Sequence, residues 1–422
     1  MGCDGSFRWP APAARRMADS IHKEVREMVA HSRLTRNADG IALVHRSQLD
    51  VGVVLGKGAF SEVHEVRLVN DPEKRKYAMK HLKFKLMSQP ENFRLAAAEL
   101  AVEAHMLASF DHPNILKIRG WAANGVASFA EGAHDSFFLV LDALDETLDQ
   151  RICRWQAQED IIKQHRQQQA TVNCGGGFFD VWKRLSQPHE ISRSLHNHPS
   201  YQPLYLEKLG VCAEIASALD YLHERGVIFR DLKPNNIGFL NGRVQLFDFG
   251  LSRELPGCDL NQPFVMSGKV GTLRYMAVEV ACQQPYNVAA DVFSWAMVSY
   301  EVLTLLKPFA GWTRDMHQNL VCCQGVRPET TVLPSNVRHM LEACWSQQPH
   351  IRPPMGSVVH QVRMLEEQQL LVCVEQQAVQ DVRVELPDDF MLPVRKTPAR
   401  MHSETVATTA SFLSAESLVD YL

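Results

Sequence analysis

Residues 229–236, Phe-Arg-Asp-Leu-Lys-Pro-Asn-Asn, bring together three groups that could carry out phosphoryl transfer. That reaction is mostly positioning and charge neutralisation, and it needs a proton acceptor, a cation and oxygen ligands for magnesium. Asp231 could receive the proton of a hydroxyl nucleophile, Lys233 could neutralise the transferring phosphate, and Asn236 could ligate the metal. These residue types in this order therefore predict a phosphate-transfer site in a single loop.

A second candidate metal ligand follows in the triplet Asp248-Phe249-Gly250. Such a triplet is weak evidence by itself, because chance would produce it in about one chain in twenty of this composition. Its position makes it specific, since it stands directly behind the apolar residues 244–247 and a short way after Asn236. Asn236 and Asp248 together predict a magnesium site.

Gly56 and Gly58 lie between two apolar runs, which predicts two strands joined by a tight glycine turn. Glycine lets the backbone approach phosphate oxygens and offer N–H donors, although an ordinary hairpin turn is the alternative. Lys80 closes the next apolar strand, where an unpaired ammonium would be costly to bury. Glu103 on the following helix is a candidate partner, unless both charges are simply solvated at the surface.

Taken together, these motifs resemble the protein kinases over residues 49–369, with an insertion between them. The resemblance implies an α+β bilobal protein kinase fold, with a small lobe of five β-strands and one main helix and a larger, mostly helical lobe. It implies ATP and Mg²⁺ as cofactors and protein substrates with serine or threonine acceptors. The implied catalytic residues are Asp231 as base with Lys233, Lys80 and Glu103; the implied metal ligands are Asn236 and Asp248; the implied nucleotide contacts are Leu55, Gly56, Lys57, Gly58, Ala59, Phe60, Ser61, Val63, Ala78, Lys80, Asp142 and Leu144.

Residues 271–279 resemble the substrate-binding segment of the tyrosine-kinase-like branch, and Lys233 is typical of serine/threonine-specific members. The resemblance also implies that Asp291 and Arg352 hold the larger lobe together and that Arg352 pairs with Glu279. Two alternatives remain: a pseudokinase acting as a nucleotide-binding or scaffolding module, and a kinase for a small molecule. The complete set of charged catalytic residues favours an active protein kinase.

Four positions depart from the family pattern. Ser61 replaces the third glycine of the loop, Val278 replaces a proline, and Phe229 replaces the usual histidine. Phe229 is expected to fill the same space against Phe249, because an aromatic ring can pack there. Gly238 stands where a bulky apolar side chain packs under adenine, and its absence would remove about 1–2 kcal/mol of contact with the nucleotide unless neighbours close in.

Three residues suggest how the site is regulated and oriented. In the family, an arginine at the position of Arg230 commonly pairs with a phosphate on the activation loop. Ser267 is the candidate acceptor of that phosphate, and an ordinary exposed loop serine is the alternative. Thr272 is expected to orient the substrate and the Asp231 carboxylate.

We expect three parts in the chain that positions these residues. Residues 1–46 are an extension with an amphipathic helix, residues 47–378 are the kinase domain, and residues 379–422 are a flexible tail. Within the kinase domain, residues 47–142 form the small lobe and residues 143–378 the large lobe. Within the large lobe, residues 153–203 are rich in Gln, His and Ser and show no clear period. We therefore expect them to be an insertion, largely loop, that does not contribute to the core.

The composition and the N-terminal residues indicate where in the cell the protein acts and which partners it lacks. A net charge of −4 argues against a nucleic-acid partner, and ten cysteines without a Cys-x-x-Cys pair suggest reduced thiols in the cytoplasm. Met1-Gly2-Cys3-Asp4-Gly5-Ser6 matches the acceptor pattern for myristate on Gly2, with Cys3 as a candidate palmitate site. We therefore expect a membrane-surface anchor, for which the basic helix of the extension is a second signal unless it packs on the kinase lobe. The oligomeric state does not follow from the sequence.

Overall fold

The computed structural model describes residues 7–34, 41–173, 201–257, 260–266 and 271–385. The chain divides into two units, Met1–Glu375 and Gln376–Leu422. The elements below lie in the first unit, apart from the last turns of helix α11, which are the described part of the second. Among the described residues, no helix is long and apolar enough to cross a lipid bilayer.

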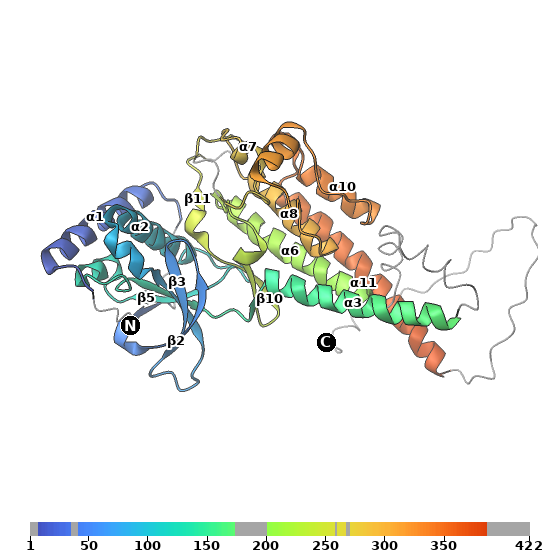
Figure 1. Ribbon diagram of the computed structural model, residues 1–422, viewed down its shortest axis with the longest axis horizontal. Helices are drawn as coiled ribbons and strands as arrows, with labels where there is room; N and C mark the ends of the chain where they lie inside the picture. Colours follow the sequence, from blue (N-terminus) through green and yellow to red (C-terminus); the bar gives the residue numbers. More distant parts are fainter. Residues whose placement is uncertain (1–6, 35–40, 174–200, 258–259, 267–270, 386–422) are drawn as a thin grey trace, which may run out of the picture. The chain divides into compact units, whose positions relative to one another are not determined.

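The small lobe is built on one six-stranded sheet with the order β1-β5-β6-β4-β3-β2 (Figure 1). Its strands are β1 (Ala42–Val44), β2 (Leu49–Lys57), β3 (Ser61–Leu68), β4 (Tyr77–Leu82), β5 (Ile118–Ala122) and β6 (Phe138–Asp142). The sheet thus has one strand more than expected, because β1 from the extension joins the edge parallel to β5. Gly120 permits this pairing, since a Cβ there would lie only 2.8 Å from the carbonyl oxygen of Ala42.

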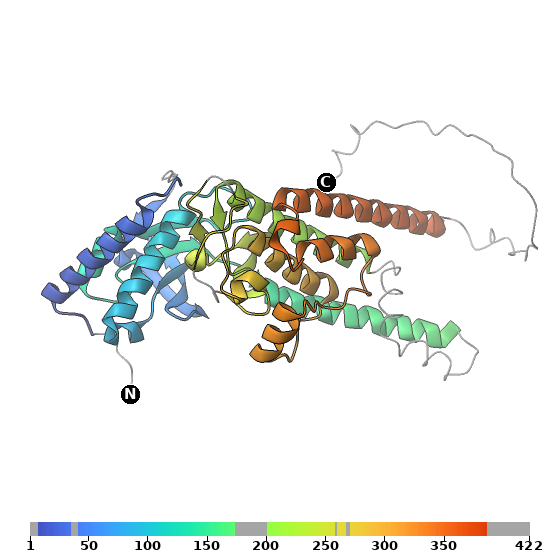
Figure 2. The same ribbon diagram turned by 90° about the horizontal axis from the view of Figure 1, so that it is seen from above.

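Two helices, rather than one main helix, accompany this sheet. Helix α2 (Pro90–Leu107) carries Glu103, and α1 (Ala11–Val29) lies along α2 (Figure 2). The amphipathic helix expected in the extension is therefore α1, and its apolar side is buried at Ala14, Ala18 and Ile21. Of the two surfaces considered for this helix, membrane or kinase lobe, it covers the lobe.

The larger lobe is mostly helical, as expected. Its main helices are α3 (Leu148–Asn173), α6 (Gln202–Glu224), α8 (Ala289–Thr304), α10 (Ser335–Cys344) and α11 (Met355–Glu385), and the short helices are α7 (Val278–Ala281) and α9 (Arg314–Met316). Its short strands are β7 (Glu146–Thr147), β8 (Val227–Ile228), β9 (Ile237–Leu240), β10 (Arg243–Leu246) and β11 (Arg253–Glu254). Helix α8, whose side chains Phe293 and Trp295 are fully buried, packs against α6 at the centre of this lobe (Figure 1). The expected α+β bilobal fold is confirmed.

The expectation of a loop over residues 153–203 is wrong for residues 153–173, which belong to helix α3, and for residues 202 and 203, with which helix α6 begins. Trp155 is fully buried, and Glu159 accepts a 2.6 Å hydrogen bond from Lys208 Nζ of α6, which is also fully buried. Leu148 and Ile152 at the start of α3 are buried as well, so apolar packing and one buried ion pair attach the helix to the core. The residues after Trp155 are mostly polar, and they therefore show no clear apolar stripe. Residues 174–200 lie outside the described residues.

We expect Trp155→Ala to lower the free energy of unfolding by about 3–5 kcal/mol, because it empties a fully buried indole site. Urea unfolding followed by circular dichroism would measure the change. Gln158→Ala, at an exposed position of the same helix, is the matched control and should change stability by less than about 0.5 kcal/mol. Equal stability of the two variants would contradict a core role for the start of α3.

Candidate active site

Lys80 lies at the junction of the two lobes. Its Nζ donates hydrogen bonds of 2.8 and 2.7 Å to the two carboxylate oxygens of Glu103 on α2, and one of 2.8 Å to Asp248 Oδ1 in the larger lobe. Burial alone would lower the pKa of Lys80, but the two carboxylates raise it above its ordinary value. The ammonium in turn holds the pKa of Asp248 below its usual range, although burial opposes this. Burial raises the pKa of Glu103, and the Lys80 ammonium opposes this rise. The structure thus brings these three predicted residues together.

Asp231 is held at both carboxylate oxygens. Oδ2 accepts hydrogen bonds from Lys233 Nζ at 2.5 Å and from Asn236 Nδ2 at 3.0 Å. Oδ1 accepts from the Thr272 backbone N–H at 3.1 Å, with the Thr272 hydroxyl 3.5 Å away. The Thr272 contacts agree with its expected role in orienting Asp231. The carboxylate is thus fixed in one orientation inside the loop that the sequence singled out.

Asp291, a buried carboxylate on α8, holds the backbone of the loop that carries Asp231. The backbone N–H groups of Phe229 and Arg230 donate to Asp291 at 2.8 Å each, and His223 Nε2 lies 3.0 Å from the same side chain. Arg230 has a positive φ of 73°, a conformation that needs such support in a non-glycine residue. Asp291 is fully buried, so the structure bears out its expected role in holding the lobe.

Phe229, which replaces the usual histidine of the family, packs against Phe249 as expected. Its ring packs edge-on against Phe249 with ring centroids 5.1 Å apart, and both rings are buried. Phe110, just after α2, lies 5.5 Å from Phe249 on another side. The aromatic ring at 229 therefore fills the space beside Phe249 without a polar group.

The small lobe contributes the glycine turn between β2 and β3 and the C-terminal end of β6 to the candidate site. Gly56 pairs with Val63 across β2 and β3, and the Gly58 N–H donates to the carbonyl of Ser61 at 2.9 Å. A Cβ at Gly58 would lie 3.1 Å from Ser61 Oγ, so the turn is tight there. Ala78 pairs with Leu141 in the sheet, next to Lys80. The predicted hairpin is present, and its tip is exposed at Phe60.

Asp142 and Leu144, both predicted to contact nucleotide, behave differently. The Asp142 carboxylate receives two hydrogen bonds from Arg119, of 2.7 and 2.8 Å, so its side chain is engaged within the sheet. Leu144 lies against Gly238, where an added Cβ would come within 2.5 Å of Leu144 Cδ1 and within 3.2 Å of the Glu146 carbonyl oxygen. The space left by Gly238 is therefore filled by Leu144, from the connection between β6 and β7.

The predicted substrate segment reaches Asp231 through Gly271. This glycine has φ of 100°, and a Cβ there would lie 2.8 Å from the Arg230 carbonyl oxygen and 3.1 Å from Asp231 Oδ1. Only glycine fits such an approach without displacing the carboxylate. Ser267 lies outside the described residues.

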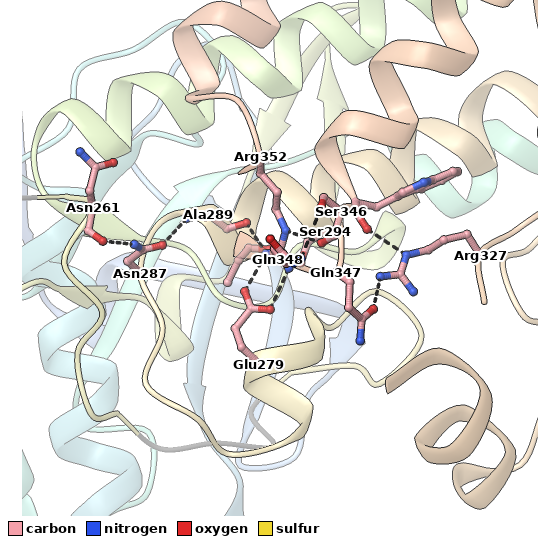
Figure 3. A network of polar contacts seen from close by, with 12 residues as sticks. Asn261, Glu279, Asn287, Ala289, Ser294, Arg327, Ser346, Gln347, Gln348 and Arg352 are labelled. Carbon is pink, nitrogen blue, oxygen red and sulfur yellow. Dashed lines mark hydrogen bonds and ion pairs between the residues drawn. The ribbon is translucent and has the colours of Figure 1, made fainter. Parts of the chain in front are cut away.

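Glu279 at the end of that segment forms the expected ion pair with Arg352 (Figure 3). Two parallel hydrogen bonds of 2.6 and 2.8 Å join the carboxylate to Nη1 and Nη2, and Arg352 also donates to the carbonyl oxygens of Ala289 and Ser346. Both side chains are buried. This bidentate pair ties the substrate segment to α8 and to the loop before α11.

The donor set fits magnesium bound together with a nucleotide. Among the described residues, no group of three or more His, Cys, Asp or Glu side chains could hold a metal by itself. Magnesium does not need such a cage, because it is usually held by one or two carboxylates together with substrate phosphates and water. Asp248 uses Oδ1 toward Lys80, and Asn236 uses Nδ2 toward Asp231, so each has an oxygen left to offer a cation.

Sequence reasoning missed two residues that hold this site. His223 contacts Asp291, and Arg119 restrains Asp142. A weak signal existed for His223, which ends a helical run shortly before the catalytic loop. No signal in the sequence indicated Arg119. Its pairing with Asp142 depends on the register between β5 and β6, which includes a shift between Ile118 and Gly120.

Comparison with known proteins adds independent evidence. A family model described as protein tyrosine and serine/threonine kinase matches residues 49–362. The serine/threonine/tyrosine-protein kinase HT1 of Arabidopsis thaliana is 36% identical over 157 residues, which are 36% of this chain and 38% of HT1. Human ribosomal protein S6 kinase alpha-6 is 29% identical over 307 residues, covering 72% of this chain and 33% of that kinase. The serine/threonine-protein kinase STY17 of Arabidopsis thaliana is 32% identical over 176 residues, covering 40% of this chain and 29% of STY17.

In these three comparisons the match spans about a third of each relative's length. The family model, by contrast, covers most of this chain and includes every residue of the site described above. The expected resemblance is confirmed: the chain belongs to the protein tyrosine and serine/threonine kinase family.

Proposed function

We propose that this protein transfers the γ-phosphoryl group of ATP to serine or threonine hydroxyls of protein substrates. The observation that carries the proposal is the position of Lys80 Nζ, within 2.7–2.8 Å of Glu103 on one lobe and Asp248 on the other. Kinases of this family need this lysine–glutamate pair and this aspartate in place together. The two Arabidopsis relatives are named serine/threonine/tyrosine-protein kinase and serine/threonine-protein kinase, and the human relative is named a ribosomal protein S6 kinase, which supports protein acceptors.

Asp231 is the proposed catalytic base. Its fixed carboxylate would accept the proton of the substrate hydroxyl, while Lys233 at 2.5 Å would neutralise charge on the transferring phosphate. Lys80 would orient the α- and β-phosphates beneath the turn at Gly56 and Gly58. Magnesium, when bound, would neutralise the phosphate charge.

The alternative is a pseudokinase that binds partners or nucleotide without chemistry. Such chains typically lack one of the catalytic or metal-binding residues, whereas here Lys80, Glu103, Asp231, Asn236 and Asp248 are all present and mutually hydrogen bonded in two groups. A small-molecule kinase is disfavoured by the protein-substrate segment, which contacts Asp231 through Thr272. The active protein kinase is therefore the better-supported function.

We place the protein in the cytoplasm, held at a membrane surface by acylation of Gly2 and Cys3. The support is the Met1–Ser6 pattern in the sequence. Because α1 uses its apolar side against the small lobe, the attachment would depend on the acyl chains. A single myristoyl chain binds membranes only marginally, so Cys3 would supply the second signal.

Asp231→Asn and Asp248→Asn should each lower kcat by about 10²-fold or more, because one removes the proton acceptor and the other a metal ligand. The measurement is phosphate transfer to a degenerate peptide library with ATP and magnesium. Asp160→Asn, at an exposed position of α3, is the matched control and should retain the wild-type rate. Wild-type rates in either test variant, with contaminating kinases excluded, would refute the assignment.

Leu144 and Gly238 should behave as a coupled pair in nucleotide binding. Gly238→Leu should weaken ATP binding or folding because its side chain would collide with Leu144. Leu144→Ala should weaken ATP binding about 5- to 30-fold, through the loss of about 1–2 kcal/mol of apolar contact. The double variant should restore much of the affinity, because it moves the bulky side chain from the β6–β7 connection to strand β9 and conserves volume. Titration calorimetry would measure this cycle, and simply additive losses would contradict the exchange.

Gly2→Ala should release the protein from membranes, because it removes the myristate acceptor, and Cys3→Ser should weaken the attachment. The measurement is fluorescence imaging of a C-terminal fusion, supported by mass spectrometry of the N-terminal peptide. Arg16→Ala, on the exposed side of α1, is the control that should leave the distribution unchanged. A wild-type protein that is already diffuse, or a Gly2→Ala protein that stays at the membrane, would exclude this anchor.

A further inference from the structure

The segment from Trp9 to Arg33 does more than cover the small lobe. Its first part is fastened to the outer side of α2. The Trp9 ring packs edge-on against Phe93 of α2 with centroids 4.6 Å apart, and the Trp9 N–H donates to the Gly132 carbonyl at 2.9 Å. Further along, Glu24 of α1 pairs with Arg94 of α2. The helix that carries Glu103 is thus held along much of its length by the extension.

Beyond α1, Ser32 and Arg33 reach the segment that follows Asp248-Phe249-Gly250. The Ser32 hydroxyl donates to Glu254 Oε2 at 2.7 Å, and the Arg33 backbone N–H donates to Glu254 Oε1 at 2.7 Å. The Arg33 guanidinium donates to the carbonyl oxygens of Leu255 at 2.9 Å and Gly257 at 3.2 Å. Two consecutive residues of the extension therefore bind three residues at the start of the activation segment.

The same serine also touches α2. Ser32 Oγ lies 3.2 Å from Nε2 of His105, two residues after Glu103. Because the hydroxyl proton is donated to Glu254, the serine oxygen accepts the hydrogen bond from His105. One side chain therefore links the helix that positions Lys80 to the strand that leaves Asp248.

In the larger lobe, Glu254 is held by its strand, and Gly226 leaves room for the Arg33 side chain. Glu254 lies in β11, which pairs with β8 just before the catalytic loop, and the Leu255 N–H donates to the Gly226 carbonyl at 2.7 Å. Gly226 has φ of 68°, and a Cβ there would lie 2.8 Å from Arg33 Nη2. The Glu254 side chain is only 14% exposed. A mostly buried carboxylate that accepts three hydrogen bonds is a stronger attachment than an exposed ion pair.

We propose that Ser32, Arg33 and Glu254 are positioning residues, which join α2 to the start of the activation segment and so hold Glu103 and Asp248 on either side of Lys80. The inference rests on the proposed kinase function for its kinetic consequence, but the contact itself is independent of that function. Because α2 and Asp248 come from different lobes, a link between them would favour the arrangement needed for phosphate transfer. Ser32 and Arg33 would then position the residues of the active site in cis.

The test compares Ser32→Ala/Arg33→Ala and Glu254→Ala with the matched control Arg16→Ala/Ser20→Ala, whose residues are exposed on α1. Each test variant should lower kcat about tenfold, the effect of losing hydrogen bonds to a charged group, with little change in KM for peptide. Combining the Ser32→Ala/Arg33→Ala and Glu254→Ala substitutions should lower kcat little further, because both remove the same contact. Ser32→Thr, which keeps the hydroxyl, should retain more activity than Ser32→Ala.

Hydrogen exchange supplies a readout that does not need activity. In both test variants, amides of α2 and of residues 253–257 should exchange faster than in the control, while the thermal midpoint of the whole protein stays within a few degrees. Unchanged exchange, multiplicative loss of kcat on combination, or loss of kcat that only follows global unfolding would overturn the proposal. If the wild type transfers no phosphate, the proposed function fails, and the exchange comparison still decides whether the link exists.

Discussion

The buried ammonium of Lys80 constrains the rest of this structure. A lysine that is 8% exposed must be paired, and breaking such a buried pair typically costs about 3–5 kcal/mol. Here the two carboxylates come from separate elements, Glu103 on α2 and Asp248 after β10. The charge can therefore be satisfied in this way only when α2 is turned toward the sheet and the Asp248 loop is turned toward the small lobe. One electrostatic requirement thus couples the two lobes.

The larger lobe meets this requirement with buried charges of its own. Asp291 accepts two backbone N–H groups of the catalytic loop, and the Glu279–Arg352 pair fixes the end of the substrate segment. Arg230 and Asp248 both have positive φ values, 73° and 66°, in sparsely populated conformations. Side chains from elsewhere in the lobe hold these loops in place, so the strain is concentrated where the site needs a particular geometry.

Two features show how neighbours accommodate a departure from the family pattern. At Gly238 the expected bulky side chain is missing, and Leu144 from the connection between β6 and β7 fills the space. The extension adds strand β1 and helix α1 to the small lobe. At Gly238 a neighbouring side chain thus supplies the packing that the glycine lacks, since a cavity would be unfavourable.

The residues of the candidate active site could be predicted from the sequence because the expected chemistry restricts them to a few residue types in a fixed order. Asp231, Lys80 and Asp248 were identified in this way, and strong apolar periods revealed most helices. The sequence did not reveal α3 beyond its start, because the buried apolar side chains Leu148, Ile152 and Trp155 all lie in its first turns and the residues that follow are mostly polar. It was also silent on Arg33 and Glu254, which lie 221 residues apart. Such contacts leave no local pattern, since each partner looks like an ordinary surface charge until the fold brings the two together.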